Sequence, residues 1–291
     1  MDVSVIIPSY NRASVLPRAI ASVQAQSLPA REILIVDDGS DDQTKALVHH
    51  EFPGCRYFFQ TNQGVSQARN LGIRKARYEW LAFLDSDDEW LPGKLEAQVA
   101  ALSESPGQRL CHTEEIWIRH GRRVNAMKKH AKSGGDIFLK CLPLCVISPS
   151  AVMIHRSVFD EVGLFDESLP ACEDYDLWLR ICARETVAFV PEPQIKKYGG
   201  HDDQLSRKYW GMDRFRVRAL EKIITSQTLS MEQQKAALET VIDQYAVLAN
   251  GALKRDMLER ASSYTCKKQH FNMMLSSLVA ENVLEGKCPD D

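Results

Sequence analysis

The 291-residue sequence lacks several patterns that would assign it to a class at once. Its eight cysteines include no CxxC pair, and Cys141 and Cys145 have no second pair with zinc-ligand spacing. We therefore expect most cysteines to be small buried apolar side chains in a reducing cytosol. Neither GxGxxG nor GxxxxGK[ST] occurs, which argues against a Rossmann dehydrogenase and a P-loop NTPase.

An excess of basic charge and long apolar runs are also missing. The formal net charge is -3 and the pI about 6.3, which gives no support for a nucleic-acid partner. No apolar run reaches the roughly 18 residues that span a bilayer, and the acidic start MDVSVIIPSYNR is unlike a signal peptide. We expect a cytoplasmic protein and leave contact with a membrane surface open.

Apolar runs and helical spacings alternate over the first 90 residues. The predicted strands cover 3–8, 32–40, 55–60 and 80–88, and the predicted helices cover 15–26, 41–52 and 65–77. This alternation predicts βαβ units and a mainly parallel sheet, with the carboxyl ends of its strands at one edge. A polar segment follows each strand: PSYNR, DDGS, QTNQGVSQARN and DSDD. Ligands of open α/β sheets bind at that edge.

The stretch WLAFLDSDDEW concentrates negative charge, so we expect a positive group nearby. If the segment is extended, Asp85 and Asp87 point to the same side. Such oxygen ligands suit Mg²⁺ or Mn²⁺, which neutralises a diphosphate that two carboxylates would repel. Acidic pairs are also common in turns and caps, and it is the position behind a buried strand that favours a metal site. We expect Asp88 to be an exposed cap of a helix with Pro92 in its first turn.

Five segments in order resemble the motifs of family 2 glycosyltransferases: VSVIIPSYNR, ILIVDDGSDD, NQGVSQARNLGI, WLAFLDSDDEW and ACEDYDLWLR. The resemblance runs from Val3 to about His201. It implies an α/β fold of the GT-A type, in which helices flank a mainly parallel, Rossmann-like sheet. It also implies a nucleotide-diphospho-sugar donor, most often a UDP-sugar, a Mn²⁺ or Mg²⁺ cofactor, and inverting chemistry.

The resemblance implies a nucleotide-sugar site made of Pro8, Ser9, Tyr10, Asp38, Arg69, Asp85 and Ser86. Tyr10 would lie against the base. Asp38 would accept a hydrogen bond from the uracil imide, which suits an acceptor-only carboxylate, and Asp37 is the alternative. Arg69 would reach the base or the diphosphate, whereas the structural alternative is a surface arginine on a helix.

The resemblance also implies the metal ligands and the catalytic base. Asp87 and Asp85 would hold the metal with His201, for which a diphosphate contact or an ordinary loop histidine is the alternative. Asp174 would take the proton of the acceptor hydroxyl, with Glu173 as the runner-up or its orienting partner. The structural alternative for this pair is that acids at a helix start complement the helix dipole.

We expect several other residues between 148 and 178 to have mainly structural roles. We expect Asp176 to be structural and Trp178 to lie in the core. Ser148 and Ser150 would border the donor sugar. The segment RSVFDEVG is expected to be a short helix with Gly163 as its C-cap.

Helix formers dominate from about residue 203 onward. Helices are predicted within 232–261, which has an apolar stripe, and within 270–284. We therefore divide the chain into a GT-A nucleotide-sugar-binding and catalytic domain, 1–202, and a C-terminal helical subdomain, 203–291. Acceptor contact, a homodimer interface and peripheral membrane contact stay open as roles for the C-terminal helices.

Together these features predict an inverting, metal-dependent hexosyltransferase of polysaccharide or glycoconjugate biosynthesis, with a saccharide or glycolipid acceptor. The alternative is a noncatalytic nucleotide-sugar-binding or scaffold protein with a GT-A fold. The presence of Asp85, Asp87 and Asp174 together argues against it. A nucleotidyltransferase would need a basic, glycine-rich loop where PSYNRAS stands.

Overall fold

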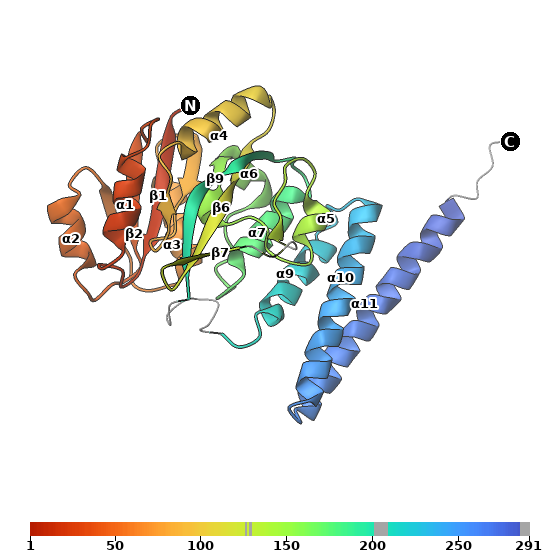
Figure 1. Cartoon of the computed structure of the whole chain (residues 1–291). Helices are drawn as coiled ribbons and strands as arrows, with labels where there is room; N and C mark the ends of the chain where they lie inside the picture. The colour runs from red at the N-terminus through yellow and green to blue at the C-terminus, as the bar shows by residue number, and fades with distance from the viewer. Residues whose placement is uncertain (126, 128–129, 201–208, 286–291) are drawn as a thin grey trace.

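The structure is a computed structural model that describes residues 1–125, 127, 130–200 and 209–285. One twisted sheet runs through the first 200 residues, with helices on both faces (Figure 1). Its strand order is β3-β2-β1-β4-β8-β6-β9-β5, with β7 beside β6. The parallel strands β1 to β4 are Val3–Ser9, Glu32–Asp37, Arg56–Phe59 and Trp80–Phe83. The predicted parallel βαβ arrangement of this half is confirmed.

The side chains of β1 alternate between two cores, one on each face of the sheet. Val5 and Ile7 lie in a cluster with Leu16 of α1, whereas Ile6 lies with Ala68 of α3 in the other. A Cβ on Gly72 of α3 would come within 2.3 Å of the Ile6 side chain, so this glycine lets the helix approach the sheet closely. The helices of this half are α1 Leu16–Gln24, α2 Thr44–Glu51, α3 Val65–Lys75 and α4 Lys94–Glu104.

The segment after β4 differs from the prediction. The strand ends at Phe83, and the backbone N–H of Asp88 donates to the carbonyl of Asp85 at 3.0 Å, which closes a turn. The chain then forms β5, Glu89–Trp90, which pairs antiparallel with β9, Ala188–Gly199. Helix α4 begins at Lys94, so Pro92 precedes it and is not in its first turn.

The second half of the sheet is mixed. Strand β6 is parallel to β9 and antiparallel to β8 and β7. These strands are β6 Leu110–Arg119, β7 Arg122–Val124 and β8 Met153–His155, and the helices are α5 Phe138–Cys141, α6 Ser157–Val162 and α7 Glu173–Cys182. Gly163 follows α6 at φ 80°, as expected of a C-cap glycine.

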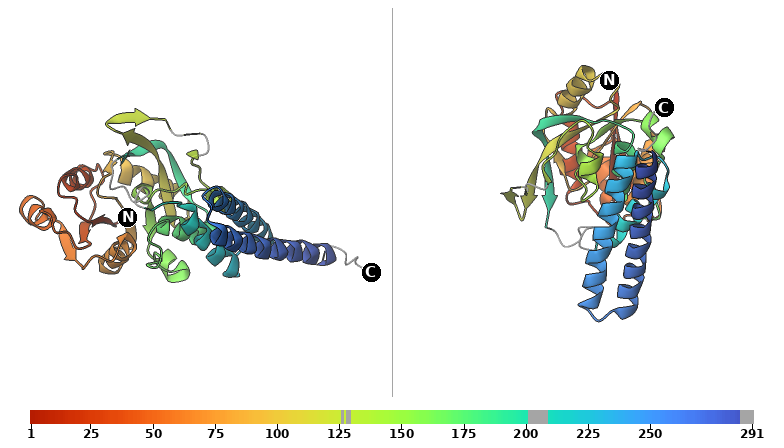
Figure 2. Two further views of the ribbon diagram at one scale, coloured as in Figure 1. Left: turned by 90° about the horizontal axis from the view of Figure 1, so that it is seen from below. Right: turned by 90° about the vertical axis from the view of Figure 1, so that its right-hand side faces the viewer.

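Within residues 209–285, three helices follow the sheet: α9 Asp213–Thr225, α10 Met231–Leu253 and α11 Leu258–Glu285. Helices α10 and α11 form a long hairpin beside the sheet (Figures 1 and 2). Their break lies at 254–257, inside the stretch 232–261 that was predicted as helical. Among the described residues, no helix is both long and apolar enough to cross a membrane. The division of the chain after residue 202 stays a prediction.

Candidate active site

The polar segments behind the first strands meet at the carboxyl edge of the sheet. Strand β1 lies between β2 and β4, and the chain passes from β1 outward to β3 before it returns to β4. Strand order therefore reverses between β1 and β4, which is where ligands of such sheets bind. The turns after these two strands contain Tyr10 and Asp85, two of the predicted site residues.

The first of these turns combines buried and exposed polar groups. Pro8 and Ser9 are buried, whereas Tyr10 is 48% exposed. Within the described part of the chain, no hydrogen-bond partner reaches Oγ of Ser9. A buried hydroxyl without a partner is costly, so this oxygen is a ready contact for a ligand.

Asp37 and Asp38 at the end of β2 have different surroundings. Asp37 is fully buried and accepts a hydrogen bond from the Tyr57 hydroxyl. Asp38 accepts from the backbone N–H groups of Gln63, at 2.9 Å, and Gly64, at 2.8 Å, and so holds the chain in place before α3. Nε2 of Gln60 also donates to Oδ1 of Asp38 at 2.7 Å, so the capacity that Asp38 retains for a nucleobase N–H lies on Oδ2.

Arg69 of α3 joins the two halves of the site. Its Nη2 donates to Oδ1 of Asp85 and its Nη1 to Oε1 of Glu173, each at 2.7 Å. Its guanidinium also lies 5.2 Å from the ring centroid of Phe165. Burial alone would lower the pKa of Arg69, but the two neighbouring carboxylates outweigh this and raise it. Arg69 is only 3% exposed, so its interpretation as a surface arginine is wrong.

A second cation, which the sequence analysis missed, is Lys197 of β9. Its Nζ donates to Oγ of Ser148 at 3.0 Å. Burial would lower its pKa, but four surrounding carboxylates raise it, so the ammonium stays charged. These carboxylates belong to Glu115, Asp88, Asp85 and Asp174. Arg69 and Lys197 are the positive groups that the charge of the DSDD segment requires.

Asp88 is not the exposed cap that we expected, because it is 2% exposed. Its Oδ2 accepts from the Ser150 hydroxyl at 2.6 Å, and its Oδ1 accepts from the backbone N–H of Tyr198 at 2.9 Å. The turn after β4 and the pairing of β5 with β9 bring this side chain inward. Burial, together with the charges of Asp87 and Asp85, raises its pKa well above the usual value.

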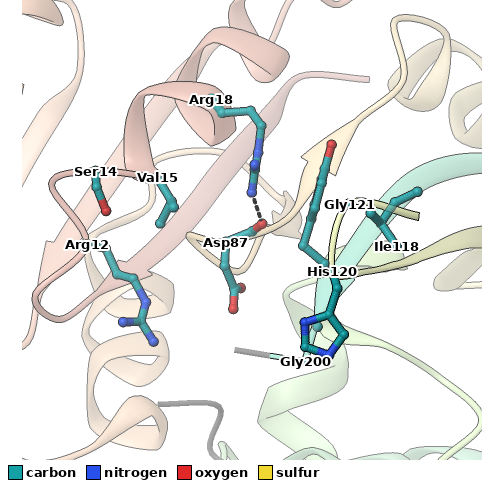
Figure 3. A pocket seen from close by; sticks show the side chains of 11 residues that line it. Arg12, Ser14, Val15, Arg18, Asp87, Ile118, His120, Gly121 and Gly200 are labelled. Carbon is teal, nitrogen blue, oxygen red and sulfur yellow. Dashed lines mark hydrogen bonds between the residues drawn. The ribbon is translucent and has the colours of Figure 1, made fainter. Parts of the chain in front are cut away.

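Asp87 lines a pocket of about 410 Å³ (Figure 3). Arg12 and Arg18, at and after the first polar turn, form one side of this pocket, and His120, between β6 and β7, forms the other. Nη2 of Arg18 donates to the carbonyl of Asp87, and its guanidinium lies 3.7 Å from the ring centroid of Tyr198. The pocket thus offers basic side chains beside one predicted metal ligand.

The other residues predicted to bind the metal or the donor differ in how exposed they are. The Asp85 side chain is 27% exposed, and Ser86 is 8% exposed. His201 lies outside the described residues. Among those described, no group of three or more His, Cys, Asp or Glu side chains could hold a metal ion.

Glu173 and Asp174 begin α7, where acidic side chains complement the helix dipole. Burial and the charge of Asp174 raise the pKa of Glu173 to about 6, although Arg69 opposes this. Oδ2 of Asp174 accepts a hydrogen bond from the Cys145 thiol at 3.5 Å, and its Oδ1 accepts one from the backbone N–H of Tyr175 at 2.7 Å. Each oxygen of the Asp174 carboxylate thus has one donor from the protein.

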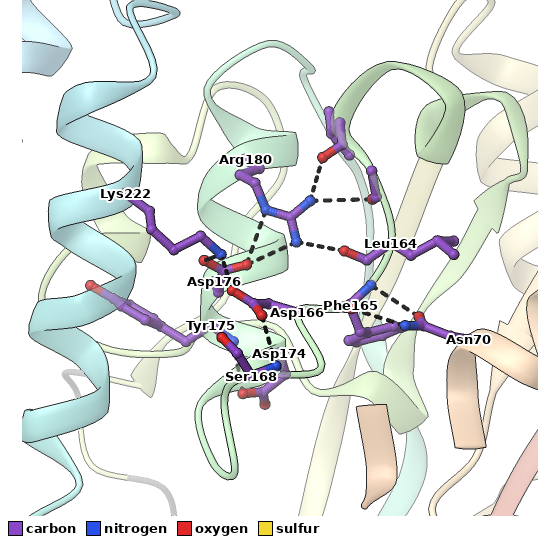
Figure 4. Close-up of polar contacts among 12 residues, drawn as sticks. Asn70, Leu164, Phe165, Asp166, Ser168, Asp174, Tyr175, Asp176, Arg180 and Lys222 are labelled. Atoms are coloured by element: carbon purple, nitrogen blue, oxygen red, sulfur yellow. Dashed lines mark hydrogen bonds and ion pairs between the residues drawn. The ribbon is translucent and has the colours of Figure 1, made fainter. Parts of the chain in front are cut away.

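Asp176 and Trp178 have the structural roles that we predicted. Asp176 is 1% exposed, and it pairs with Arg180 at 2.8 Å and with Lys222 at 2.7 Å (Figure 4). These contacts fasten α7 to α9. Trp178 is 1% exposed and belongs to the core. Ser148 and Ser150, both buried, contact Lys197 and Asp88 as described above.

The sheet order and the acidic edge are those of a GT-A fold, and comparison with known proteins agrees. The family described as Glycosyl transferase family 2 matches residues 4–163, more than half of the chain. The chain therefore belongs to this family, and the resemblance read from its sequence is confirmed. Its structure is similar to that of S. aureus TarS 1–349 in complex with UDP-GlcNAc, with a TM-score of 0.65, 16% identity, and coverage of 93% of this chain and 92% of that chain.

Two relatives illustrate the range of similar sequences. An uncharacterised glycosyltransferase of Rickettsia typhi is 34% identical over 199 residues, which are 67% of this chain and 63% of the relative. The UDP-Glc:alpha-D-GlcNAc-diphosphoundecaprenol beta-1,3-glucosyltransferase WfgD of Escherichia coli is 31% identical over 191 residues, which are 65% of this chain and 72% of that protein. The chain thus spans less than two thirds of the length of the Rickettsia typhi relative.

Proposed function

We propose that the protein is an inverting glycosyltransferase that transfers a sugar from a UDP-sugar to an acceptor hydroxyl. The observation that carries this proposal is the meeting of Asp85 with the Glu173–Asp174 pair through Arg69, at the edge where the strand order reverses. The UDP-Glc donor in the name of the E. coli relative and the UDP-GlcNAc bound to TarS support a uridine nucleotide.

The nucleoside would lie between the turns after β1 and β2. Tyr10 is exposed enough to pack against the base, and the unpartnered hydroxyl of Ser9 is available to it or to the ribose. Asp38 would accept from the uracil imide with its remaining capacity. The positive charges of Arg69 and Lys197 would favour the diphosphate next to this nucleoside.

Mn²⁺ or Mg²⁺ fits the carboxylates present here. Asp85 is partly exposed, Asp87 lines the pocket, and their charges raise the pKa of Asp88, which shows that negative charge is concentrated at this turn. These metals are commonly bound by one or two carboxylates together with substrate phosphates. We therefore assign Asp87 and Asp85 as ligands, and His201 stays a predicted one. When bound, the metal would neutralise charge on the departing diphosphate.

Asp174 is the group best placed to act as the base. Its contacts with Cys145 and Tyr175 orient the carboxylate and leave lone pairs for the acceptor hydroxyl. Burial and the charge of Asp174 raise the pKa of the Cys145 thiol, so it remains a protonated donor. Glu173 is engaged by Arg69, which makes it a positioning residue that fixes the start of α7.

The acceptor would be a saccharide or a glycolipid of polysaccharide or glycoconjugate biosynthesis. The diphosphoundecaprenol-linked acceptor in the name of the E. coli relative supports a lipid-linked saccharide. A lipid-linked acceptor would place the reaction at the cytoplasmic face of a membrane.

A panel of nucleotide sugars tests the donor assignment. Thermal unfolding of the full chain would be followed with each donor, with and without Mn²⁺. At a hundredfold excess over its Kd, a bound UDP-sugar should stabilise the protein by about 2.7 kcal/mol. Asp87→Asn should abolish the part of this effect that depends on Mn²⁺. No response to any uridine, guanosine or thymidine sugar would contradict the proposal.

A further inference from the structure

The turn that joins α10 to α11 presents apolar side chains to solvent. Residues 253–260, here called the hairpin tip, are all exposed. Three of them are large and apolar, because Leu253 is 53%, Met257 41% and Leu258 64% exposed. Isolated apolar residues are common on soluble proteins, but three large ones within eight exposed residues make the hairpin tip a candidate interaction surface.

Trp210 extends this surface. It is 53% exposed, and the guanidinium of Arg260, in the hairpin tip, lies 5.1 Å from its ring centroid. Arg214 of α9 covers the ring at 3.6 Å. Tryptophan beside arginine is typical of side chains at a membrane–water interface, where the ring is half in an apolar environment.

The net charge of this surface is positive, whereas that of the whole chain is negative. The hairpin tip carries three basic side chains against two acidic ones, and Arg214 over the Trp210 ring adds a fourth basic group, in a chain of net charge -3. They are Arg214, Lys254, Arg255 and Arg260 against Asp256 and Glu259. Each basic residue near an anionic bilayer strengthens its binding several-fold.

The direction of the hairpin adds a functional argument. Strand β1 runs away from the N-terminus, and the hairpin tip points the same way as the carboxyl ends of the parallel strands (Figures 1 and 2). A surface that binds the tip therefore lies on the side of the molecule where the candidate active site opens. Leu253 also lines a groove of about 440 Å³ at this end, whose other lining residues, Leu258 among them, belong to α11.

We propose that the hairpin tip and Trp210 dock on an anionic lipid surface. The binding is interfacial: Leu253, Met257, Leu258 and Trp210 enter the headgroup region, and the basic side chains contact lipid phosphates. If the proposed function holds, this contact presents the active site to a lipid-linked acceptor. The docking itself does not depend on the donor, so a failure of the lipid test and a failure of the donor test are distinguishable.

Vesicle binding by the full chain tests the proposal. Cosedimentation would be measured with phosphatidylcholine vesicles that contain or lack phosphatidylglycerol. Binding is expected only with phosphatidylglycerol, together with a blue shift of tryptophan emission that Trp210→Phe removes. The double variant Lys254→Glu, Arg255→Glu should bind more than about tenfold more weakly, because it reverses two charges.

A pair of matched variants separates the tip from the rest of the hairpin. Leu258→Glu should weaken vesicle binding, whereas Val279→Glu should bind like the wild type. Val279 is also exposed, at 45%, but it lies 21 residues further along α11, about 30 Å away. Circular dichroism would confirm that both variants remain folded.

Three outcomes would overturn the proposal. The first is a wild-type protein that fails to bind phosphatidylglycerol vesicles. The second is equal binding of Leu258→Glu and wild type. The third is a dimer in sedimentation velocity that Leu258→Glu dissociates, without any vesicle binding, which would assign the hairpin tip to a second copy of the chain.

Discussion

Arg69 and Glu173 are 104 residues apart in the sequence, yet Nη1 of the arginine lies 2.7 Å from Oε1 of the glutamate. The same guanidinium binds Asp85, so one buried cation connects the turn after β4 to the start of α7. The candidate donor half and the candidate base half of the site are held together by this contact.

Replacement of Arg69 by Met should destabilise the fold strongly. It leaves Glu173 buried and Asp85 partly buried without their common partner, and such a loss costs about 3–5 kcal/mol. Urea unfolding followed by circular dichroism measures it. The matched control is Arg31→Met, which removes an exposed pair with Asp2 and should leave the midpoint unchanged. Equal midpoints for both variants would contradict the structural role of Arg69.

The neighbouring lysines of β9 give a second prediction. Lys197→Met should destabilise the protein by about 2–3 kcal/mol, because it leaves the buried carboxylate of Asp88 without a nearby ammonium, whereas Glu115 keeps its ion pair with Lys132 at 3.2 Å. Lys196→Met should cost at most about 1 kcal/mol, because its side chain is 36% exposed and pairs with Glu89 near the surface. Urea unfolding midpoints of the two variants would be compared. A lower midpoint for Lys196→Met than for Lys197→Met would contradict the assignment of Lys197 as the buried lysine.

The sequence predicts those parts of the site that depend on neighbouring residues, but not those that depend on pairing between distant segments. The strands β1, β2 and β4 and the polar segments behind them were predicted, because continuous apolar runs are local features, but the turn that begins at Asp85 was predicted as extended strand. The pairing of β5 with β9 is not local, and it is this pairing that carries Asp88 inward. Strand alternation indicates that Lys196 and Lys197 face opposite sides, but only the register with β5 and β6 decides which side is the site.

The hairpin break shows the same limit in the C-terminal helices. The segment KRDM at 254–257 contains neither Gly nor Pro, and Asp256 ends up in the left-handed region at φ 56°. Nothing in the local composition favours a turn there over continuation of the predicted helix. The packing of α11 along α10, with Phe271 stacked on Tyr245 at 6.0 Å between ring centroids, fixes the position.

The lowered pKa of His112 predicts how the free energy of unfolding changes with pH. Burial and the charge of Lys132 lower its pKa from 6.5 to about 3 in the folded state. The folded protein therefore binds fewer protons than the unfolded chain between these values, and stability falls as the pH falls from about 6.5 toward 3. The slope is at most about 1.4 kcal/mol per pH unit. In urea titrations at several pH values, His112→Gln should lose less stability than wild type over this range, and parallel curves would contradict the assignment.

The assignment of Asp174 as the base is tested by the variant Asp174→Asn. The amide keeps the shape of the side chain but cannot take the proton of the attacking hydroxyl. Donor binding would be measured by calorimetry with a UDP-sugar, and turnover by release of UDP with water in place of the acceptor. Asp160→Asn, on the exposed side of α6, is the matched control.

The most direct measurement is the ratio of UDP release between Asp174→Asn and wild type at saturating UDP-sugar and Mn²⁺. We predict an unchanged Kd for the donor and a release rate lower by about 10²–10⁴, with Asp160→Asn equal to wild type. A release rate equal to wild type in Asp174→Asn would contradict the assignment of the catalytic base.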